Sequence, residues 1–484
     1  MVVRAFLFYM NNILQEIGDI IADFFSKEEA WLIIIVLFGA GVVATFAAPD
    51  LGEEFSRIIN SIWLFFKGTW WLWAFLILFA ITKEMILHWR QEDFKSKINF
   101  FLLEIKIPRE IDKSPRAMEQ VLAAIHTLRN APGDIGEKYV DGEVTSWFTL
   151  EMASFGGEVH FYVRGKKKQR NLVEAAFFSY YPDVELEEVD DYLEVTLPQS
   201  VKEIYGQRKD FWSTEMLLAK EEAYPIKTYE DFEHEADEKD FDPISIFMEI
   251  LGKVKKNEFV GIQFNIAPAG NEWKDQWQNL VEDLRKKVSY IAGGDRNDSS
   301  DQISQMGRSP GLYDVLRSVE ENLSKPAFDT LLRFIYIAPK ETYYDSFARR
   351  GLVGSFNQYG SLDLNSFVQN HAVSTRTLFW YWPHIFPKIR NEYKKQRAIK
   401  NYINRAIPPE RWIGKLLTSG MFSWNFSSKR FKMTTKCLAT LFHPPTAVVL
   451  TAPHVKRVES RKGGPPAGLA IYGEDEEEVR RLFS

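Results

Sequence analysis

Two clusters of basic residues are the strongest candidates for binding chemistry in this sequence. The first lies between a predicted hairpin and a predicted helix and consists of Lys166, Lys167, Lys168 and Arg170. The second lies on a predicted helix over residues 387–405 and consists of Lys388, Arg390, Lys394, Lys395, Arg397, Lys400 and Arg405, with Tyr393 and Tyr402 interleaved. Clustered cations of this kind can contact the phosphates of DNA or of an anionic lipid.

A different interpretation of the second cluster is a solvated helix face that docks an acidic partner. The net charge of −6 and the lack of base-reading motifs favour this interpretation. If the helix does bind DNA, replacing Lys394 and Lys395 with glutamate should abolish a salt-sensitive interaction. Unchanged binding in a mobility-shift assay would refute that expectation.

Common catalytic and metal-binding motifs are absent from the sequence. It contains neither a G-x-x-x-x-G-K-[ST] phosphate loop nor a G-x-G-x-x-G loop. His234 and Glu235 do not extend to H-E-x-x-H, and the acidic stretch from Asp295 lacks the glycine and glutamate of a calcium loop. The single cysteine, Cys437, cannot form an intramolecular disulfide or a thiolate-rich zinc site. We therefore expect a protein that is not an enzyme, with no catalytic residue, no cofactor and no metal.

An enzyme with an unrecognised site is the remaining alternative for catalysis. The polar cluster of Arg349, Arg350, Asn357 and Gln358 would be its candidate site. These residues are more simply interpreted as turn and packing residues, and a pocket without perturbed titratable groups would exclude the enzyme hypothesis.

Two apolar stretches near the N-terminus predict a membrane anchor. Residues 31–48 contain no charge, and as a helix they would span about 27 Å, close to the thickness of a bilayer core. Residues 62–81 are apolar except for Lys67, which can snorkel to the interface. We predict a two-helix transmembrane hairpin within residues 31–90, preceded by an amphipathic segment over residues 1–30.

The orientation of this hairpin follows from the lysine and arginine residues in its loops. Arg57 is the only basic residue between the two spans, whereas Lys83, Arg90, Lys95 and Lys97 follow the second. The positive-inside rule therefore places both termini and the main domains in the cytoplasm, at the cell (inner) membrane.

The remaining chain, with its ordinary mixture of 45% hydrophobic and 26% charged residues, predicts an α+β fold of more than one unit. Within residues 98–215 the pattern reads strand, helix, strand, strand, helix, strand, and Gly156-Gly157 marks the hairpin. This βαββαβ order predicts a ferredoxin-like unit.

A second ferredoxin-like unit, which includes the basic helix, is predicted over residues 258–455. Its pattern reads β-α-β-α, and the positions of its last strands stay open. The polar, proline-punctuated residues 216–257 form the predicted junction between the two units, and residues 456–484 form a linker-like hinge with an acidic tail.

Several stretches resemble a known group of proteins when they are taken in order. They are FTLEMASFGGEVHFYVRGKKKQRNLVEAAFFSYYPDVEL, YPIKTYEDFEHE, DPIS, GLVGSFNQYGSLDLNSF, KCLATLFHPP and VESRKGGPPAGL, and they lie between residues 100 and 469. The chain resembles the N-terminal, membrane-anchored, non-ATPase region of coupling-protein-like DNA translocases of conjugation and type IV secretion, which are related to HerA and TraG.

In those relatives a P-loop ATPase follows the hinge, whereas here eleven residues follow Gly473. The ATPase is then either a separate polypeptide or a part of the protein that this sequence does not include. We favour the first alternative, in which the resemblance implies a membrane-anchored docking subunit that recruits a separately encoded DNA-translocase ATPase. DNA and a second copy of the chain are further candidate partners. The alternative is a standalone membrane scaffold or envelope protein with no role in DNA transfer.

Overall fold

The structure is a computed structural model that describes residues 49–108, 113–235, 242–292, 310–343, 347–378, 384–409, 411–419, 425–446 and 457–458. The chain divides into two compact units, one made of residues 1–90 and 409–417 and the other of residues 91–408 and 418–484. The predicted segment 1–30 and the predicted span 31–48 lie outside the described residues, as do the hinge and the tail beyond Val458.

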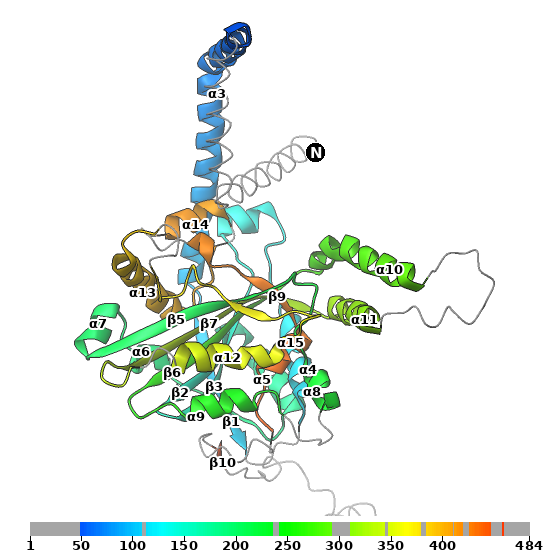
Figure 1. The fold of residues 1–484 in the computed structure, drawn as a ribbon. Helices are drawn as coiled ribbons and strands as arrows, with labels where there is room; N and C mark the ends of the chain where they lie inside the picture. Colours follow the sequence, from blue (N-terminus) through cyan, green and yellow to red (C-terminus); the bar gives the residue numbers. More distant parts are fainter. Residues whose placement is uncertain are drawn as a thin grey trace, which may run out of the picture. The chain divides into compact units, whose positions relative to one another are not determined.

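The first unit contains most of the long helix α3 (Pro49–Ser96) and all but the last residue of the short helix α14 (Trp412–Thr418). The predicted span 62–81 lies within α3, so its helical character is confirmed (Figure 1). The stretch Lys67–Ser96 is long and apolar enough to cross a membrane. No other helix among the described residues meets both conditions. The two-helix hairpin stays a prediction, because its other span is not described.

The second unit is built on one ten-stranded sheet (Figure 1). Its strands are β1 (Phe100–Pro108), β2 (Phe148–Phe155), β3 (Glu158–Lys166), β4 (Glu185–Glu188), β5 (Lys209–Leu218), β6 (Phe259–Pro268), β7 (Ala327–Pro339), β8 (Phe367–Gln369), β9 (Phe431–Thr434) and β10 (Arg457–Val458). The main path runs β10-β1-β3-β2-β6-β7-β5-β8, while β4 pairs with β1 and β9 with β7. All these pairings are antiparallel except the short parallel pairing of β1 with β10.

The sheet consists of two halves with the same strand order. The first half runs β4-β1-β3-β2, and the second runs β8-β5-β7-β6. The halves meet where β2 pairs with β6, in a register that extends from Phe148↔Ile266 to Phe155↔Phe259. Because nearly every residue of these two strands is buried, both faces of the sheet are covered at this junction.

Strand β5 shows where the predicted domain boundary needs correction. It runs across the boundary between the predicted first unit, 98–215, and the predicted junction, 216–257. In the structure β5 pairs with β7 and β8, and it therefore belongs to the second half of the sheet. The proline-punctuated composition that marked the junction begins only after this strand ends.

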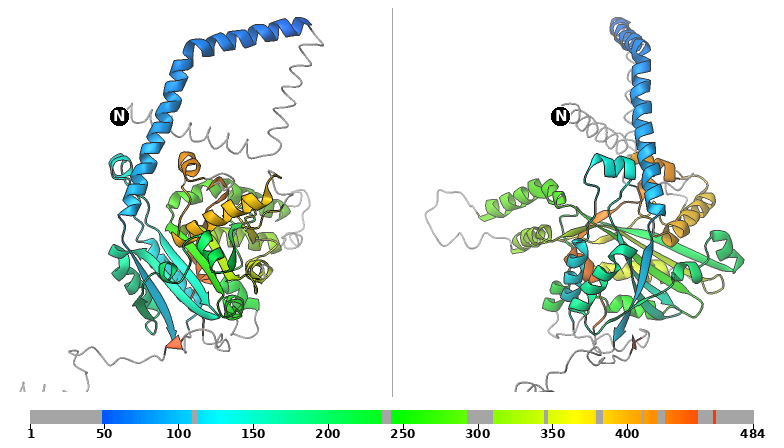
Figure 2. Two further views of the ribbon diagram at one scale, coloured as in Figure 1. Left: turned by 90° about the vertical axis from the view of Figure 1, so that its left-hand side faces the viewer. Right: turned by 180° about the vertical axis from the view of Figure 1, so that it is seen from behind.

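One face of the sheet is covered by α4 (Pro115–His126), α5 (Arg170–Tyr180), α9 (Ser245–Gly252), α15 (Thr435–Leu441) and the short α12 (Val353–Ser355). The predicted apolar face of α4, formed by Met118, Val121, Leu122 and Ile125, is buried in this core. The other face is covered by α6 (Tyr192–Val195), α7 (Val201–Gly206) and α13 (Pro387–Ile403). Figure 2 shows these layers from two further directions.

The remaining helices connect or extend the sheet. The pair α10 (Gln278–Ala292) and α11 (Pro310–Ser324) is inserted between β6 and β7 and packs around a small apolar core of its own. Helix α8 (Tyr229–Glu235) lies between β5 and α9 in the chain. Short stretches of 3-10 or π-helix occur at Glu137–Asp141, Lys167–Gln169, Asn271–Trp277, Phe347–Leu352, Phe356–Tyr359 and Asn425–Ser427.

The hairpin between β2 and β3 turns at Gly156 and Gly157, as predicted. Their φ angles are +60° and +97°, in the region that favours glycine. A Cβ atom on Gly157 would lie 2.9 Å from the carbonyl oxygen of Gly252 and 3.0 Å from that of Val254. This hairpin therefore depends on glycine both for its backbone conformation and for its contact with the end of α9.

Candidate functional site: a buried polar row beneath helix α13

The first basic cluster is only partly available to an anionic partner. Lys166 is half-buried, with its Nζ 5.6 Å from the ring centroid of Phe94 and 5.9 Å from that of Trp147, and burial lowers its pKa. Arg170 donates to Glu174 at 2.7 Å and also pairs with Glu188. Lys167 and Lys168 are exposed. The structure therefore leaves two of the four predicted cations facing solvent.

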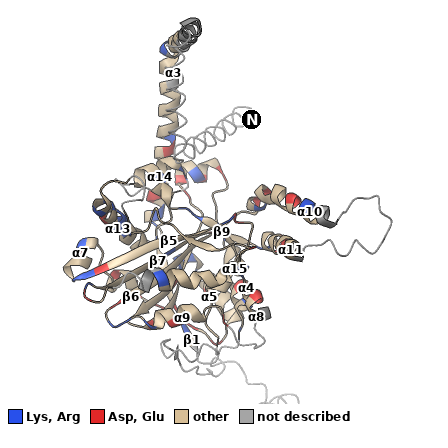
Figure 3. Ribbon diagram, in the orientation of Figure 1, with Lys and Arg blue, Asp and Glu red and all other residues tan. Residues whose placement is uncertain are grey.

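Six of the seven residues of the second basic cluster lie on α13, and Arg405 lies two residues beyond its end, but most of the cluster faces the protein interior. Arg390, Lys394, Lys395 and Arg405 are all buried, so the expectation of one solvent-facing basic surface is wrong for these four residues. Arg397 is partly buried against the same side, and Lys388 and Lys400 are exposed. The cations nearest the sheet recur at the helical spacing of three to four residues, which puts them on one side of α13. Figure 3 shows the charged residues on the ribbon.

A row of polar side chains crosses the sheet in register and accounts for the burial of one of these cations, Arg405. The row runs Glu104, Tyr162, Glu151, Gln263, Arg333, Glu215 over six neighbouring strands. All six lie on the face that α6 and α13 cover. Buried carboxylates are costly unless they are paired and hydrogen-bonded, so this row requires cationic partners from the covering layer.

Arg405 is the partner of Glu151. Its Nε and Nη2 donate to the carboxylate of Glu151 at 2.5 and 3.1 Å, and its Nη1 and Nη2 donate to Asp191 at 2.5 and 3.0 Å. Tyr192 donates to Glu151 at 2.6 Å, and Gln263 Nε2 donates at 3.3 Å. Burial alone would raise the pKa of Asp191, but the bond from Arg405 lowers it. Arg405 is thus held in a closed network of ion pairs.

Arg333 is the partner of Glu215 in the second half of the sheet. Its Nε and Nη2 donate to one oxygen of Glu215 at 3.2 and 3.0 Å, and Ser428 donates to the other oxygen at 2.5 Å. Arg333 also donates to the backbone carbonyls of Asn401 at 2.8 Å and Ala406 at 3.2 Å, at the C-terminal end of α13. These bonds fasten the end of α13 to β7.

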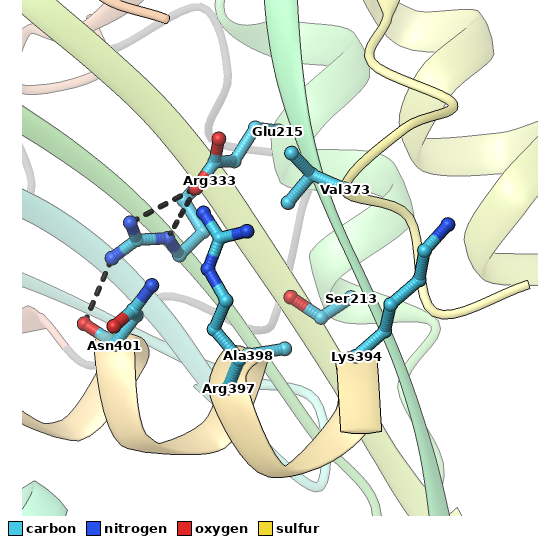
Figure 4. A pocket seen from close by; sticks show the side chains of 8 residues that line it. All are labelled: Ser213, Glu215, Arg333, Val373, Lys394, Arg397, Ala398 and Asn401. Atoms are coloured by element: carbon cyan, nitrogen blue, oxygen red, sulfur yellow. Dashed lines mark hydrogen bonds and ion pairs between the residues drawn. The ribbon is translucent and has the colours of Figure 1, made fainter. Parts of the chain in front are cut away.

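Near this pair lies a small pocket lined by Ser213, Glu215, Arg333, Val373, Lys394, Arg397, Ala398 and Asn401 (Figure 4). Burial lowers the pKa of Lys394 to about 8, and the neighbouring Arg390 and Arg397 act in the same direction. Lys395, on the adjacent side of the helix, donates to Asp210 at 2.5 Å and to the hydroxyl of Tyr205 at 3.1 Å. The ion pair of Lys395 with Asp210 thus orients α13 on the sheet, whereas Lys394 donates to the backbone carbonyl of His371 at 3.5 Å.

A close approach at Gly261 completes the packing beneath α13. A Cβ atom on this residue of β6 would lie 1.8 Å from the hydroxyl oxygen of Tyr402 and 2.9 Å from its Cζ. Tyr402 is fully buried and comes from the last turn of α13. Only glycine leaves room for this ring against the central strand.

A second buried polar cluster joins three of the sequence motifs quoted above. Asp242 of DPIS accepts from His443 Nε2 of LFHPP at 2.8 Å and from the backbone N–H and the hydroxyl of Thr446 at 2.8 and 2.9 Å. Tyr359 and Gln358 of FNQYG donate to the carbonyl of Pro243 at 2.8 and 3.1 Å. The motifs therefore build one hydrogen-bonded corner of the fold.

The acidity of Asp242 reflects these donors. Burial would raise its pKa, but His443 and the backbone N–H groups of Thr446 and Ile244 lower it to about 2. Sequence reasoning did not single out Asp242 or His443 as interacting residues. The available signal was their place in DPIS and KCLATLFHPP, two of the stretches that carry the resemblance, and it does not predict their contact.

The alternative polar cluster is dispersed. Gln358 is engaged with Pro243, while Arg350 and Asn357 are exposed, and the side chain of Arg349 lies outside the description. No group of three or more histidine, cysteine, aspartate or glutamate residues that could hold a metal ion occurs in the described part of the chain.

Comparison with known proteins gives one assignment. No curated protein matches the sequence. Residues 83–457 match the model of a family described as a domain of unknown function, DUF8128. Because this match covers more than half of the chain, the protein belongs to the DUF8128 family.

Proposed function

We propose that this protein is a membrane-anchored docking subunit of a conjugation-like or type IV secretion-like DNA transfer apparatus, which recruits a P-loop ATPase. The observation that carries the anchoring part is the surface of α3. Its outward side chains include Trp70 at 66%, Phe75 at 61% and Leu78 at 62% exposed. A continuous apolar surface of this extent marks an interaction with a membrane or a partner.

The composition of α3 favours the bilayer over a protein partner. Between Lys67 and Lys83 the helix carries no charge (Figure 3). Its exposed apolar residues follow one another along the chain and so lie on all sides instead of along one stripe. A helix that is hydrophobic all round is typical of a buried helix or a membrane span. Trp70, Trp71 and Trp73, near the start of the uncharged stretch, suit the interfacial belt. The basic residues after Ile81 favour a cytoplasmic position for the following unit.

In this proposal the sheet unit is the docking platform. We infer that each half of the sheet is a ferredoxin-like unit, with the second carrying the α10–α11 insertion, and that the two are joined edge to edge through β2 and β6. The inference is supported by the shared strand order of the halves. A sheet covered on both faces and fixed by buried ion pairs is a rigid support for a partner.

The proposed ATPase partner rests on the resemblance to coupling-protein-like DNA translocases. Direct contact with DNA, if it occurs through the predicted residues, falls to the exposed Lys167, Lys168, Lys388 and Lys400. Of the buried cations, Lys395 and Arg405 are paired with Asp210 and Glu151 of the sheet. Arg390 and Lys394 donate to the backbone carbonyls of Ile385 and His371. Recruitment of a partner is therefore favoured over DNA binding as the main task of this chain.

The test is an affinity purification of the tagged full-length protein from membranes of its native organism, after mild cross-linking. A P-loop ATPase enriched over a tagged, unrelated membrane protein is the expected result. Retention of the protein in carbonate-washed membranes is expected in parallel. Repeated purifications that recover no ATPase would reject the docking role in favour of a standalone scaffold, and extraction by carbonate would reject the anchor.

A further inference from the structure

We propose that α14 is a second membrane contact, an amphipathic turn of helix that lies in the headgroup region beside the cytoplasmic end of α3. This inference rests on the proposed membrane span in α3. It adds a lipid-binding surface that comes from a segment more than three hundred residues further along the chain.

The position of α14 is fixed by contacts inside the first unit. Arg411, directly before the helix, pairs with Glu84 of α3, and both side chains are mostly buried. A Cβ atom on Gly414 would lie 3.4 Å from His88 Nδ1 of α3, so the two helices approach closely at this glycine. Ile413 is buried at the same contact. Helix α14 therefore lies against α3 at the level of residues 84–88.

The outward side of α14 is apolar. Trp412, Leu416 and Leu417 are 44%, 54% and 50% exposed, and Trp412 and Leu416 are one helical turn apart. At the same level of α3 the outward residues are Met85, Ile86 and Trp89, and these are exposed as well. The two helices thus both expose apolar residues at the same level, from two distant parts of the sequence.

The level of this surface on α3 identifies its partner. The uncharged stretch of α3 ends at Thr82, and residues 84–88 lie roughly 3–9 Å further along the helix axis at about 1.5 Å per residue. That distance corresponds to the headgroup region of a bilayer whose hydrocarbon core holds the preceding apolar residues. Tryptophan, leucine and a snorkelling lysine such as Lys415 are typical of helices that lie in this region.

Continuity with α3 argues for lipid as the occupant. The exposed apolar residues of α14 lie at the level of α3 that directly follows the stretch which α3 would bury in the bilayer. A protein partner would have to cover α14 while leaving the adjacent lipid-facing part of α3 in place.

The test uses the full-length chain in lipid vesicles and a fluorescent label whose depth can be measured. Cys437, which is buried, is first replaced by serine, and single cysteines are then introduced as Leu416→Cys, Leu78→Cys or Leu362→Cys and labelled with a nitrobenzoxadiazole dye. Quenching is measured with lipids that carry a nitroxide either at the headgroup or deep in the acyl chain. Leu362, 97% exposed in the second unit, is the matched aqueous control.

We expect the label at position 416 to be quenched at least twofold more by the headgroup nitroxide than by the deep one. The label at position 78 should show the opposite order, and the label at position 362 should not be quenched. No quenching at position 416 with strong deep quenching at position 78 would overturn the role of α14 and leave the span in place. No quenching at either position would overturn both proposals.

A second pair of variants protects the test against a folding defect. If Leu416→Cys does not yield folded protein, Leu417→Cys probes the same surface. If the Cys437→Ser background is unstable, Cys437→Ala replaces it. Circular dichroism of each labelled protein checks that the helix and sheet content is that of the unlabelled chain.

Discussion

Replacing Arg405 with methionine tests whether the basic residues of the α13 region hold the fold or bind a ligand. In the structure Arg405 is buried and makes four hydrogen bonds to Glu151 and Asp191. Methionine keeps most of the aliphatic volume but removes the charge. The change leaves Glu151, which is fully buried, with only Tyr192 and Gln263 as donors.

The expected loss of stability follows from that uncompensated carboxylate. Removing one partner of a buried ion pair typically costs about 3–5 kcal/mol, because the other charge stays buried. Lys400→Met is the matched control, since Lys400 lies five residues before Arg405, on α13, and is exposed. An exposed substitution of this kind should change the free energy of unfolding by less than about 0.5 kcal/mol. The double variant Glu151→Gln with Arg405→Met should recover part of the loss.

The assay is urea unfolding of the full-length protein in detergent, followed by circular dichroism. We expect a lower midpoint for Arg405→Met with an unchanged slope, because the surface exposed on unfolding stays the same. If Arg405→Met and Lys400→Met unfold within about 1 kcal/mol of each other while DNA binding is lost only for Arg405→Met, the reasoning fails. Arg405 would then act on a ligand and not on the fold.

Three further predictions concern the buried carboxylate of Asp242, the close contact at Gly261 and the exposed lysines of α13. The pKa of Asp242 is lowered to about 2 from 3.8, so its stabilisation of about 2 kcal/mol is present above pH 4 and is lost as the pH falls toward 2. The stability difference between wild type and Asp242→Asn should shrink over that interval, and a constant difference in urea titrations from pH 6 to pH 2.5 would contradict this cause. Gly261→Ala should lower the free energy of unfolding by about 1–3 kcal/mol through overpacking, and Tyr402→Phe in the same chain should restore part of it because the clashing hydroxyl is removed. No rescue would show that the clash lies elsewhere. Lys388→Glu with Lys400→Glu should weaken any salt-sensitive DNA binding in a mobility-shift assay without changing stability, and undiminished binding would exclude α13 as a DNA contact.

The burial of α13 shows why a charge pattern could not predict its role. Cations spaced three or four residues apart form one side of a helix whether that side faces water or a buried carboxylate. The partners that decide between these outcomes are far away in the sequence. Asp210 is 185 residues from Lys395, and Glu151 is 254 residues from Arg405.

The pairing of strands was likewise beyond local inference. Strand β5 lies next to the first half in the sequence, but it pairs with β7 and β8 in the second half. The contact between β2 and β6 merges the halves into one sheet. Strand pairing depends on long-range hydrogen bonds and on which faces are covered, and residue periodicity reports neither of these.

The amino-acid sequence by itself determined the features that depend on neighbouring residues. The apolar run of α3, the buried face of α4 around Val121 and the glycine turn at Gly156 and Gly157 all follow from local spacing and backbone freedom. The tertiary structure alone decided that two halves share one sheet, that Arg405 is buried against Glu151, and that α14 lies beside α3. These depend on contacts between residues hundreds of positions apart, whose free energy arises only when the chain has folded.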